Sequence, residues 1–353
     1  MSEREEFDEE LSNSGDEGDP SENPLVDLSP FADGFEGTNI DEDSDFELED
    51  AEYQDDADRV YAELLARVGE SAPQPRLDAT RRALELLGDP QRSYPIVHIT
   101  GTNGKTSTSR VTESILRAYG LRTGLLTSPH LVRVNERIVI DGLAISNRAL
   151  AANWEDIRPY VALVDGELVA AGEEPLTFFE ALTVLAFASF AEAPIDVGVI
   201  EVGMGGEWDS TNVADGQVAV FTPISLDHTQ RLGATIQQIA RTKAGIIKPV
   251  ASVVSAAQVP EALAELERAA DLTESTLKVE GSAFELTEST VAVGGQVISV
   301  RGLAGADTRT VSSPDFKSRR TIVHGVRPSQ PRSPDRANST DLPSGDGQAP
   351  RLP

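Results

Sequence analysis

Short apolar runs alternate with amphipathic segments through the middle of the chain. The runs are rich in β-branched residues and predict strands at 96–99, 125–126, 197–202, 218–223 and 252–255. Apolar residues at helical spacing predict helices at 106–119, 178–190, 234–244 and 260–270. Strands that alternate with helices are typical of a mostly parallel sheet with helices on both faces, so we expect an α/β fold.

The pattern also predicts what flanks this alternation. Before it, residues 61–68 carry apolar side chains at helical spacing, and a second helix covers 79–87. After it, two apolar segments at 290–293 and 297–300 flank a Gly-Gly pair, which predicts a hairpin. Residues 305–353 are rich in Pro, Ser, Arg and Asp without periodic apolar positions, so neither a helix nor a strand is expected there.

The negative charge is concentrated at the N-terminal end. The net charge is −29, and residues 1–58 hold 24 Asp and Glu against one basic residue, Arg4. Such a composition cannot bury enough apolar surface to offset the entropy lost on ordering, so we predict a disordered acidic arm over 1–58. A docking peptide around 24–35 stays open as an alternative. The rest of the chain is about neutral, and no nucleic-acid surface is expected.

Cysteine is absent from the sequence. This excludes disulfides and metal sites with Cys ligands, and it fits a reducing cytoplasm. The N-terminus shows no basic-then-apolar signal, and no apolar run reaches about 18 residues. We therefore expect a cytoplasmic protein without a membrane segment.

A glycine-framed loop follows the strand predicted at 96–99. It reads Gly101-Thr102-Asn103-Gly104-Lys105-Thr106-Ser107 and leads into the helix at 106–119. Backbone N–H groups of such a loop point at an anion, the helix N-terminus adds its positive dipole end, and Lys105 reaches the terminal phosphates. The loop is shorter than the usual P-loop pattern, yet it predicts a nucleotide-binding site. The alternative is an ordinary Gly/Asn turn before a capped helix.

Four predicted strands end at residues that carry chemistry. Lys105, Ser128, Glu201 and His228 each follow one of them, and in an open α/β sheet the carboxyl ends of the strands meet at one edge. Glu201 with the hydroxyls of Ser128 and of Thr106 or Ser107 suits Mg²⁺, whereas His228 would be an unusual ligand. Capping or ion pairing for Glu201 and packing for His228 stay open as alternatives. His98 inside the first strand is expected to be structural, and the role of His130 stays open.

Five segments in this order resemble one family. They are 101–107, 127–135 (Thr-Ser-Pro-His-Leu-Val-Arg-Val-Asn), 201–212 (Glu-Val-Gly-Met-Gly-Gly-Glu-Trp-Asp-Ser-Thr-Asn), Asp227-His228 and 243–248 (Lys-Ala-Gly-Ile-Ile-Lys). Together they are similar to the folylpolyglutamate synthase / dihydrofolate synthase family of the Mur ligase superfamily. The resemblance implies a Mur ligase-type ATP-binding domain with a P-loop over residues 59–303.

The resemblance also implies an ATP-dependent amide ligation. A carboxylate of folate or dihydropteroate would attack the γ-phosphate to form an acyl phosphate, and the amine of L-glutamate would then displace phosphate. Lys105 would hold the β- and γ-phosphates. Ser128, Glu201 and His228 match the family's magnesium positions. Lys243 matches a lysine that becomes carbamylated, with an ordinary helix-end lysine as the alternative.

Two further stretches match family segments that contact the pteroate part of the substrate. They are Thr177, Phe178, Phe179 and Glu180, and then Trp208, Asp209 and Ser210. Aromatic stacking is expected there. The resemblance thus assigns catalytic roles to Lys105, Lys243 and His228, and it implies a monomer whose partners are small molecules.

The sequence departs from the family at three places. Glu207 stands where the family has Arg, and Thr242 replaces the Glu before Lys243. Residues 304–353 contain neither a His-Gln-x-x-Asn segment nor a stretch similar to the family's C-terminal domain, and they read as a shifted frame or a truncated product. Because that domain completes the site, we expect impaired ligation. The alternatives are an inactive nucleotide-binding fragment and a Mur-type peptide ligase.

Overall fold

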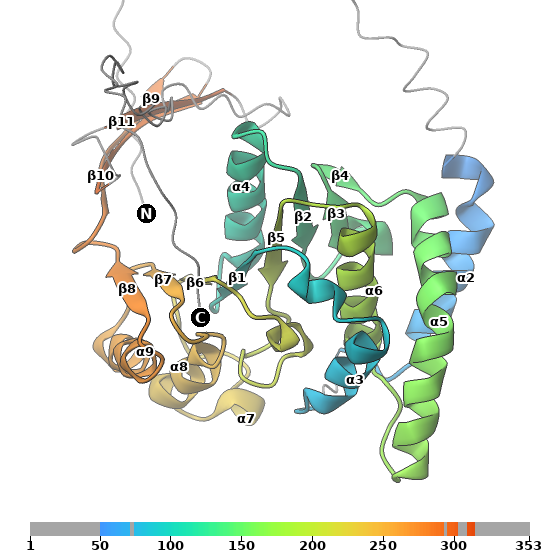
Figure 1. Cartoon of the computed structure of the whole chain (residues 1–353). Helices are drawn as coiled ribbons and strands as arrows, with labels where there is room; N and C mark the ends of the chain where they lie inside the picture. The colour runs from blue at the N-terminus through green and yellow to red at the C-terminus, as the bar shows by residue number, and fades with distance from the viewer. Residues whose placement is uncertain (1–49, 71–73, 293–294, 303–308, 315–353) are drawn as a thin grey trace, which may run out of the picture. The chain divides into compact units, whose positions relative to one another are not determined.

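The computed structural model describes residues 50–70, 74–292, 295–302 and 309–314 (Figure 1). Its helices are α2 (Gln54–Leu65), α3 (Asp78–Leu86), α4 (Lys105–Ala118), α5 (Asn147–Ala170), α6 (Phe178–Glu192), α7 (Thr229–Leu232), α8 (Ile236–Ala244) and α9 (Pro260–Leu272), with short 3₁₀ turns η2 (Pro90–Arg92), η3 (Val134–Arg137) and η4 (Ser210–Val213). Its strands are β1 (Ile96–Thr100), β2 (Thr123–Leu126), β3 (Ile138–Ile140), β4 (Leu143–Ala144), β5 (Val197–Glu201), β6 (Val218–Phe221), β7 (Ser252–Ser255), β8 (Thr276–Val279), β9 (Glu285–Ala292), β10 (Gly295–Arg301) and β11 (Arg309–Pro314).

An eight-stranded sheet forms the centre of the fold. Its order is β4-β3-β2-β5-β1-β6-β7-β8. Strands β2, β5, β1, β6, β7 and β8 run parallel to one another. Strand β3 pairs antiparallel with β2, and β4 pairs antiparallel with β3. The α/β fold with a mostly parallel sheet is therefore confirmed. Strand β1 lies between β5 and β6, so the loop that follows β1 emerges between the ends of two neighbouring strands.

Helices cover both faces of this sheet (Figure 1). On one face, α4 packs over a small cluster formed by Ile99, Leu125, Val139 and Val199. On the other face, two apolar clusters form. The larger one joins α2, α3, α5 and α6 to the strands. The smaller one joins α8 and α9 to β6 and β7. This burial holds β1, β2, β5 and β6 in register, which places their carboxyl ends side by side.

Helix α5 is not predicted by the sequence pattern. Pro159 and Gly166 fall within it, and both residue types disfavour a helix interior. The helix forms because one side of it is buried against α2, α3 and α6. The side chains that make this contact are Leu150, Trp154, Ile157, Val161 and Val164. Strands β3, β4 and β8 are also unpredicted.

The described chain begins before the predicted end of the acidic arm. Helix α2 starts at Gln54, and the Asp50 carboxylate accepts a hydrogen bond from the backbone N–H of Asn147. The prediction of disorder is therefore wrong for residues 50–58. Asp55 and Asp56 lie in the first helical turn, where the helix dipole favours carboxylates. The predictions for residues 1–49 lie outside the described residues.

The predicted hairpin belongs to a separate antiparallel sheet of order β11-β10-β9. Strands β9 and β10 are longer than predicted, and the turn at 293–294 lies outside the described residues. Strand β11 contradicts the expectation that 305–353 contain no strand. Its register runs from Arg309 opposite Val300 to Pro314 opposite Gly295, and such backbone pairing needs no apolar periodicity. The rest of the predicted tail also lies outside the described residues.

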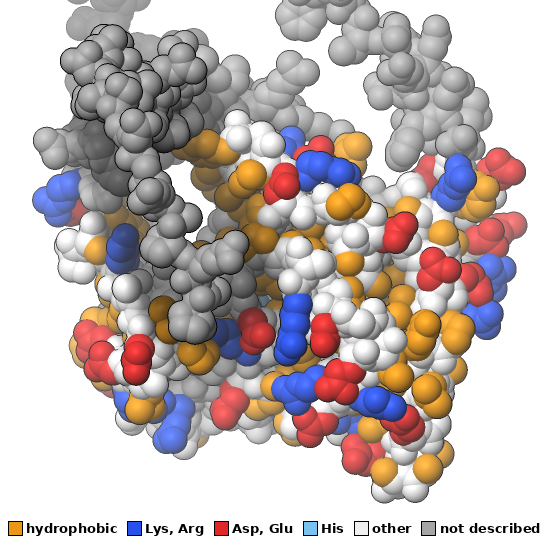
Figure 2. Space-filling model, in the orientation of Figure 1, with side chains coloured by type: hydrophobic (Ala, Val, Ile, Leu, Met, Phe, Trp, Pro, Cys, Tyr) orange, Lys and Arg blue, Asp and Glu red, His pale blue; other side chains and the backbone are white. Residues whose placement is uncertain are grey.

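Charges on the described surface are mixed in sign. Figure 2 shows a face on which acidic and basic side chains are interspersed rather than gathered by sign. This agrees with a folded part that is about neutral once the acidic N-terminal end is set aside. Within the described ranges, no helix combines the length and the apolar character needed to cross a membrane.

Candidate active site

The loop between β1 and α4 is fixed to the end of β6. Gly101 has φ +147°, and a Cβ atom there would lie 1.8 Å from the Thr222 hydroxyl oxygen, so only glycine fits. The Thr102 N–H donates to the Pro223 carbonyl at 3.0 Å. Gly104 is left-handed at the N-cap of α4, and no side chain caps the helix. The first N–H groups of α4 therefore stay available to an anion.

Two lysines that are far apart in the sequence border this loop. The Lys105 ammonium lies 3.4 Å from the Thr102 carbonyl oxygen, and Lys243 donates to the Gly101 carbonyl at 2.7 Å. Lys243 is only 3% exposed. Burial, followed by the charge of Lys105, lowers its pKa to about 8, against the opposing effect of Asp227 and Asp209. The site therefore holds a lysine that loses its proton far more easily than usual.

Glu201 lies at the end of β5 and is almost fully buried. It accepts hydrogen bonds from the Thr106 hydroxyl at 2.8 Å and from the Ser128 N–H at 3.4 Å. Burial raises the pKa of this carboxyl, while the Thr106 bond and the Lys105 charge act in the opposite direction. A desolvated carboxylate beside a phosphate loop favours a cation as its further partner.

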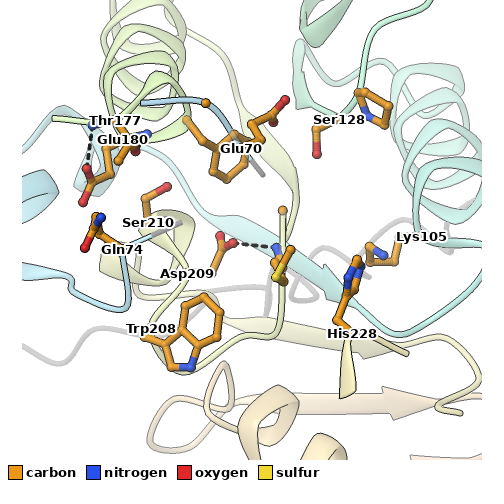
Figure 3. A pocket seen from close by; sticks show the side chains of 15 residues that line it. Glu70, Gln74, Lys105, Ser128, Thr177, Glu180, Trp208, Asp209, Ser210 and His228 are labelled. Atoms are coloured by element: carbon orange, nitrogen blue, oxygen red, sulfur yellow. Dashed lines mark hydrogen bonds between the residues drawn. The ribbon is translucent and has the colours of Figure 1, made fainter. Parts of the chain in front are cut away.

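His228 occupies a strained position at the start of α7. Its φ is 47°, in the left-handed region that is unusual for a residue other than glycine. Its N–H donates to the Asp227 carboxylate at 2.8 Å, and its side chain is 50% exposed. Figure 3 places its ring beside Lys105, on one side of a cavity.

The donors at this edge fit Mg²⁺ only together with a nucleotide. Within the described residues, no group of three or more His, Cys, Asp or Glu side chains lies close enough to hold a metal. Glu201 supplies one buried carboxylate, with the Thr106 hydroxyl in contact and Ser128 next to it. One carboxylate, neutral oxygens and substrate phosphates make a typical Mg²⁺ environment. The predicted set of Ser128, Glu201 and His228 is compatible with such a site.

A cavity of about 320 Å³ opens next to the phosphate loop. Figure 3 shows Lys105, Ser128 and His228 on one side of it, and Thr177, Glu180 and Gln74 on the other. It is lined by Gly69, Glu70, Gln74, Lys105, Ser128, Pro129, Thr177, Phe179, Glu180, Gly203, Met204, Trp208, Asp209, Ser210 and His228. Six of the seven predicted substrate-binding residues thus share one cavity with three residues of the phosphate and metal side.

Phe178 is the exception among these seven residues. It is 4% exposed and packs in the main core, where the Arg137 guanidinium lies 5.0 Å from its ring centroid. Consecutive residues of a helix point about 100° apart, so Phe178 and its neighbour Phe179 cannot face the same space. Phe179 lines the cavity. Phe178 therefore lies outside the cavity lining, and its contact with a ligand stays a prediction.

Several cavity residues also serve the local structure. Thr177 and Glu180 form a capping box at the start of α6, and Arg76 holds both oxygens of Glu180 at 2.9 and 3.1 Å. Asp209 accepts from the N–H groups of Met204 and Thr211 at 2.8 and 3.0 Å, and burial raises its pKa. These contacts fix the cavity walls before any ligand arrives.

Gly69, Glu70 and Gln74 are the cavity residues that lie outside every segment the sequence pattern singles out. They belong to the connection between α2 and α3, which follows no strand of the sheet. Because the sequence analysis looks for functional residues directly after predicted strands, it does not consider this connection. The stretch is polar and contains Pro, and no spacing in it distinguishes these residues from other loop residues.

The two unusual residues, Glu207 and Thr242, are in backbone contact. The Glu207 N–H donates to the Thr242 carbonyl at 2.8 Å, and the Glu207 side chain is exposed. Neither residue is part of the cavity lining in the described chain. His98 is buried and lies 2.9 Å from the Thr211 hydroxyl, and burial lowers its pKa to about 3, as suits a structural histidine.

Comparisons with known proteins point to one family. Residues 99–298 match the Mur ligase middle domain. The dihydrofolate synthase/folylpolyglutamate synthase of Mycobacterium tuberculosis is 45% identical over 251 residues, which cover 69% of this chain and 52% of that protein. The chain thus spans about half the length of the curated relatives it matches.

Solved structures agree with this match. Folylpolyglutamate synthase of Mycobacterium tuberculosis complexed with ADP and AMPPCP aligns with a TM-score of 0.68 and 42% identity, covering 74% of this chain and 58% of that one. A folylpolyglutamate synthase complex with AMPPCP and folate aligns with a TM-score of 0.65 and 35% identity, covering 72% and 62% of the two chains. Since the Mur ligase middle domain accounts for more than half of its residues, the chain belongs to the Mur ligase family.

Proposed function

We propose that this chain is the nucleotide- and folate-binding part of a ligase that joins L-glutamate to folate or dihydropteroate with ATP. One observation carries the proposal: a single cavity reaches from Lys105 and Ser128 beside the phosphate loop to Phe179 and Trp208. One compound can lie there with its ring against aromatic side chains and its carboxylate at the phosphate loop. The names of the relatives, which include a complex with AMPPCP and folate, support the same substrates.

The proposed reaction activates a carboxylate and then transfers it. The substrate carboxylate attacks the γ-phosphorus of ATP, ADP leaves, and an acyl phosphate forms. The amine of L-glutamate attacks the acyl carbon, loses a proton, and phosphate leaves. Lys105 and the uncapped N-terminus of α4 stabilise charge on the phosphate oxygens.

A magnesium ion supports the proposed chemistry by neutralising phosphate oxygens when it is bound. Glu201 would hold it together with the hydroxyls of Thr106 and Ser128, and His228 stands on the same side of the cavity. Carbamylation of Lys243 would turn a buried cation beside Gly101 into an anion. A cytoplasmic location and a monomeric state stay predictions.

The test is the formation of ADP and of a glutamylated product by the purified chain. It is mixed with Mg-ATP, L-glutamate and either dihydropteroate or tetrahydrofolate, and the product mass is measured. We expect ADP release only with a pteroate-type substrate present, and Lys105→Ala should abolish it, with the exposed Lys278→Ala, outside the cavity lining, as control. Mg-ATP binding without a product would favour a nucleotide-binding chain without ligation. Turnover with a cell-wall peptide precursor alone would favour a Mur-type peptide ligase.

A further inference from the structure

Three carboxylates line the cavity, and two of them have little acceptor capacity left. Glu180 accepts from Arg76 twice and from the Thr177 N–H, and its side chain is 5% exposed. Asp209 accepts from the Met204 N–H and from the N–H and hydroxyl of Thr211, and it is 4% exposed. An ionised carboxylate offers about four lone-pair sites, so both groups are nearly saturated inside the protein.

Glu70 differs from both. Within the described residues its carboxylate accepts from one partner, the guanidinium of Arg137, at 2.7 and 2.9 Å, and 39% of its side chain is exposed. The described residues therefore leave two of its four lone-pair sites free. In Figure 3 its side chain lies between Ser128 and Thr177, along the wall that joins the phosphate side to the Thr177 side of the cavity.

Arg137 holds Glu70 in place because Arg137 itself is immobilised. Its side chain is 3% exposed, its Nε–H donates to His130 Nδ1 at 2.7 Å, and its guanidinium stacks over the Phe178 ring at 5.0 Å. His130 in turn meets the Tyr61 hydroxyl at 3.2 Å. The buried guanidinium of Arg137 needs a negative charge nearby, and this need alone does not fix the direction of the carboxylate. The two-bond pairing does fix it, and it directs Glu70 along the cavity wall.

We propose that Glu70 is a substrate-binding residue that accepts hydrogen bonds from N–H donors of the pteroate-type substrate, and that Arg137 is its positioning residue. The inference rests on the proposed function, since dihydropteroate carries such donors on its ring amine and ring nitrogen. Among the carboxylates of the cavity lining, Glu70 combines free acceptor sites, partial exposure and a fixed orientation. These three properties together suit recognition of a donor rather than a purely structural role.

The experiment measures dihydropteroate binding by calorimetry in the presence of Mg²⁺ and a non-hydrolysable ATP analogue. Glu70→Gln should weaken this binding by about tenfold or more, as for loss of a charged hydrogen bond. Binding of the ATP analogue should not change. The exposed Glu174→Gln is the matched control, since it makes the same charge change outside the cavity lining and should leave both affinities intact.

Arg137→Lys tests the positioning role. It keeps the positive charge but loses the fork and the bond to His130. We expect weaker dihydropteroate binding with ATP-analogue binding unchanged. The double variant Glu70→Gln/Arg137→Lys should bind no more weakly than Glu70→Gln alone, because both changes act through one carboxylate.

The outcomes separate this inference from the proposed function. If the unaltered chain binds dihydropteroate and Glu70→Gln binds it equally well, Glu70 is only the counter-ion of Arg137 and this inference is wrong while the function stands. If Arg137→Lys loses affinity for both dihydropteroate and the ATP analogue, Arg137 has a general structural role and does not act through Glu70 alone. If the unaltered chain binds the ATP analogue but not dihydropteroate, the proposed function fails and the inference fails with it.

Discussion

Glu201 shows at the residue scale how a buried carboxylate lowers stability. Burial raises its pKa above the ordinary value of 4.5. The folded chain therefore keeps this proton to a higher pH than the unfolded chain does. In that window the unfolded state binds fewer protons, so the free energy of unfolding falls as pH rises. This loss of stability is absent at low pH, where both states are protonated, and it is complete above the raised pKa.

Glu201→Gln should accordingly be more stable than the unaltered chain at pH 7 and about equally stable near pH 4. The amide oxygen can still accept the bond from the Thr106 hydroxyl. Mg-dependent ATP turnover should fall by about tenfold or more, because an amide is a poor Mg²⁺ ligand. Urea unfolding at the two pH values and ADP release check both parts. A variant that is less stable at pH 7 would contradict the argument.

Lys243 carries the second prediction at this scale. Its pKa of about 8, against an ordinary 10.5, leaves about half of the amine neutral at pH 8. Only the neutral amine reacts with CO₂ to form a carbamate, so carbamylation should increase as pH rises through 8. We expect a carbamate signal in ¹³C NMR after addition of labelled bicarbonate.

The control for this signal is Lys248, the other lysine whose pKa burial lowers. Lys248→Arg should keep the carbamate resonance, and Lys243→Arg should remove it. A resonance that survives Lys243→Arg would place the modification elsewhere. No resonance in the unaltered chain at pH 8 would favour the ordinary buried lysine that donates to Gly101.

At the scale of elements, one arginine attaches the segment before α3 to the start of α6. Arg76 pairs with Glu180 and also donates to the carbonyl oxygens of Glu174 and Pro175. Arg76→Ala would leave the buried Glu180 without its partner, and we expect a loss of roughly 3 kcal/mol in the free energy of unfolding.

Arg82 offers the matched comparison for this prediction. It makes the same two-bond pairing, with Glu167 at 3.0 and 3.0 Å, but both side chains are more than two-fifths exposed. Solvent screens such a pair, so Arg82→Ala should change stability little. Urea unfolding of the two variants decides the matter. Equal losses would mean that burial is not what makes the Arg76 pair important.

The elements also show how far sequence reasoning reaches. The strands that end at Lys105, Ser128, Glu201 and His228 are predictable, because parallel strands in one sheet must end at one edge. Helix α5 is not, since its internal Pro159 opposes local propensity and only tertiary burial stabilises it. The sequence pattern alone does not show which of Phe178 and Phe179 faces the cavity, because this depends on how the helix packs in the fold.

Glu70 escapes prediction for a different reason. It lies on a connection between two helices, and its position depends on Arg137, which is 67 residues away in the sequence. Contacts of this kind have no local pattern. The phosphate side of the site follows from sheet topology, whereas part of the opposite wall becomes visible only in the folded chain.

At the scale of the whole molecule, the described fold begins at residue 50, after a strongly acidic stretch of sequence. Residues 1–49 are rich in Asp and Glu, whereas Ala57, Val60 and Leu64 of α2 are buried in the main core. The Glu63 carboxylate also accepts from the Trp154 ring N–H at 2.8 Å, which ties α2 to α5. The two parts of the N-terminal region should therefore respond differently to removal.

A chain that starts at residue 50 should keep the thermal stability and ATP-analogue affinity of the full chain. A chain that starts at residue 66 should lose roughly 3–6 kcal/mol, because Val60 and Leu64 each contribute about 1.5–3 kcal/mol through burial. It should also expose the apolar face of α5, so we expect aggregation on mild heating. Thermal unfolding and light scattering of the three chains provide the measurement. A marked loss on removal of residues 1–49 alone would mean that the acidic segment takes part in the fold, whereas full stability without α2 would mean that the core closes without it.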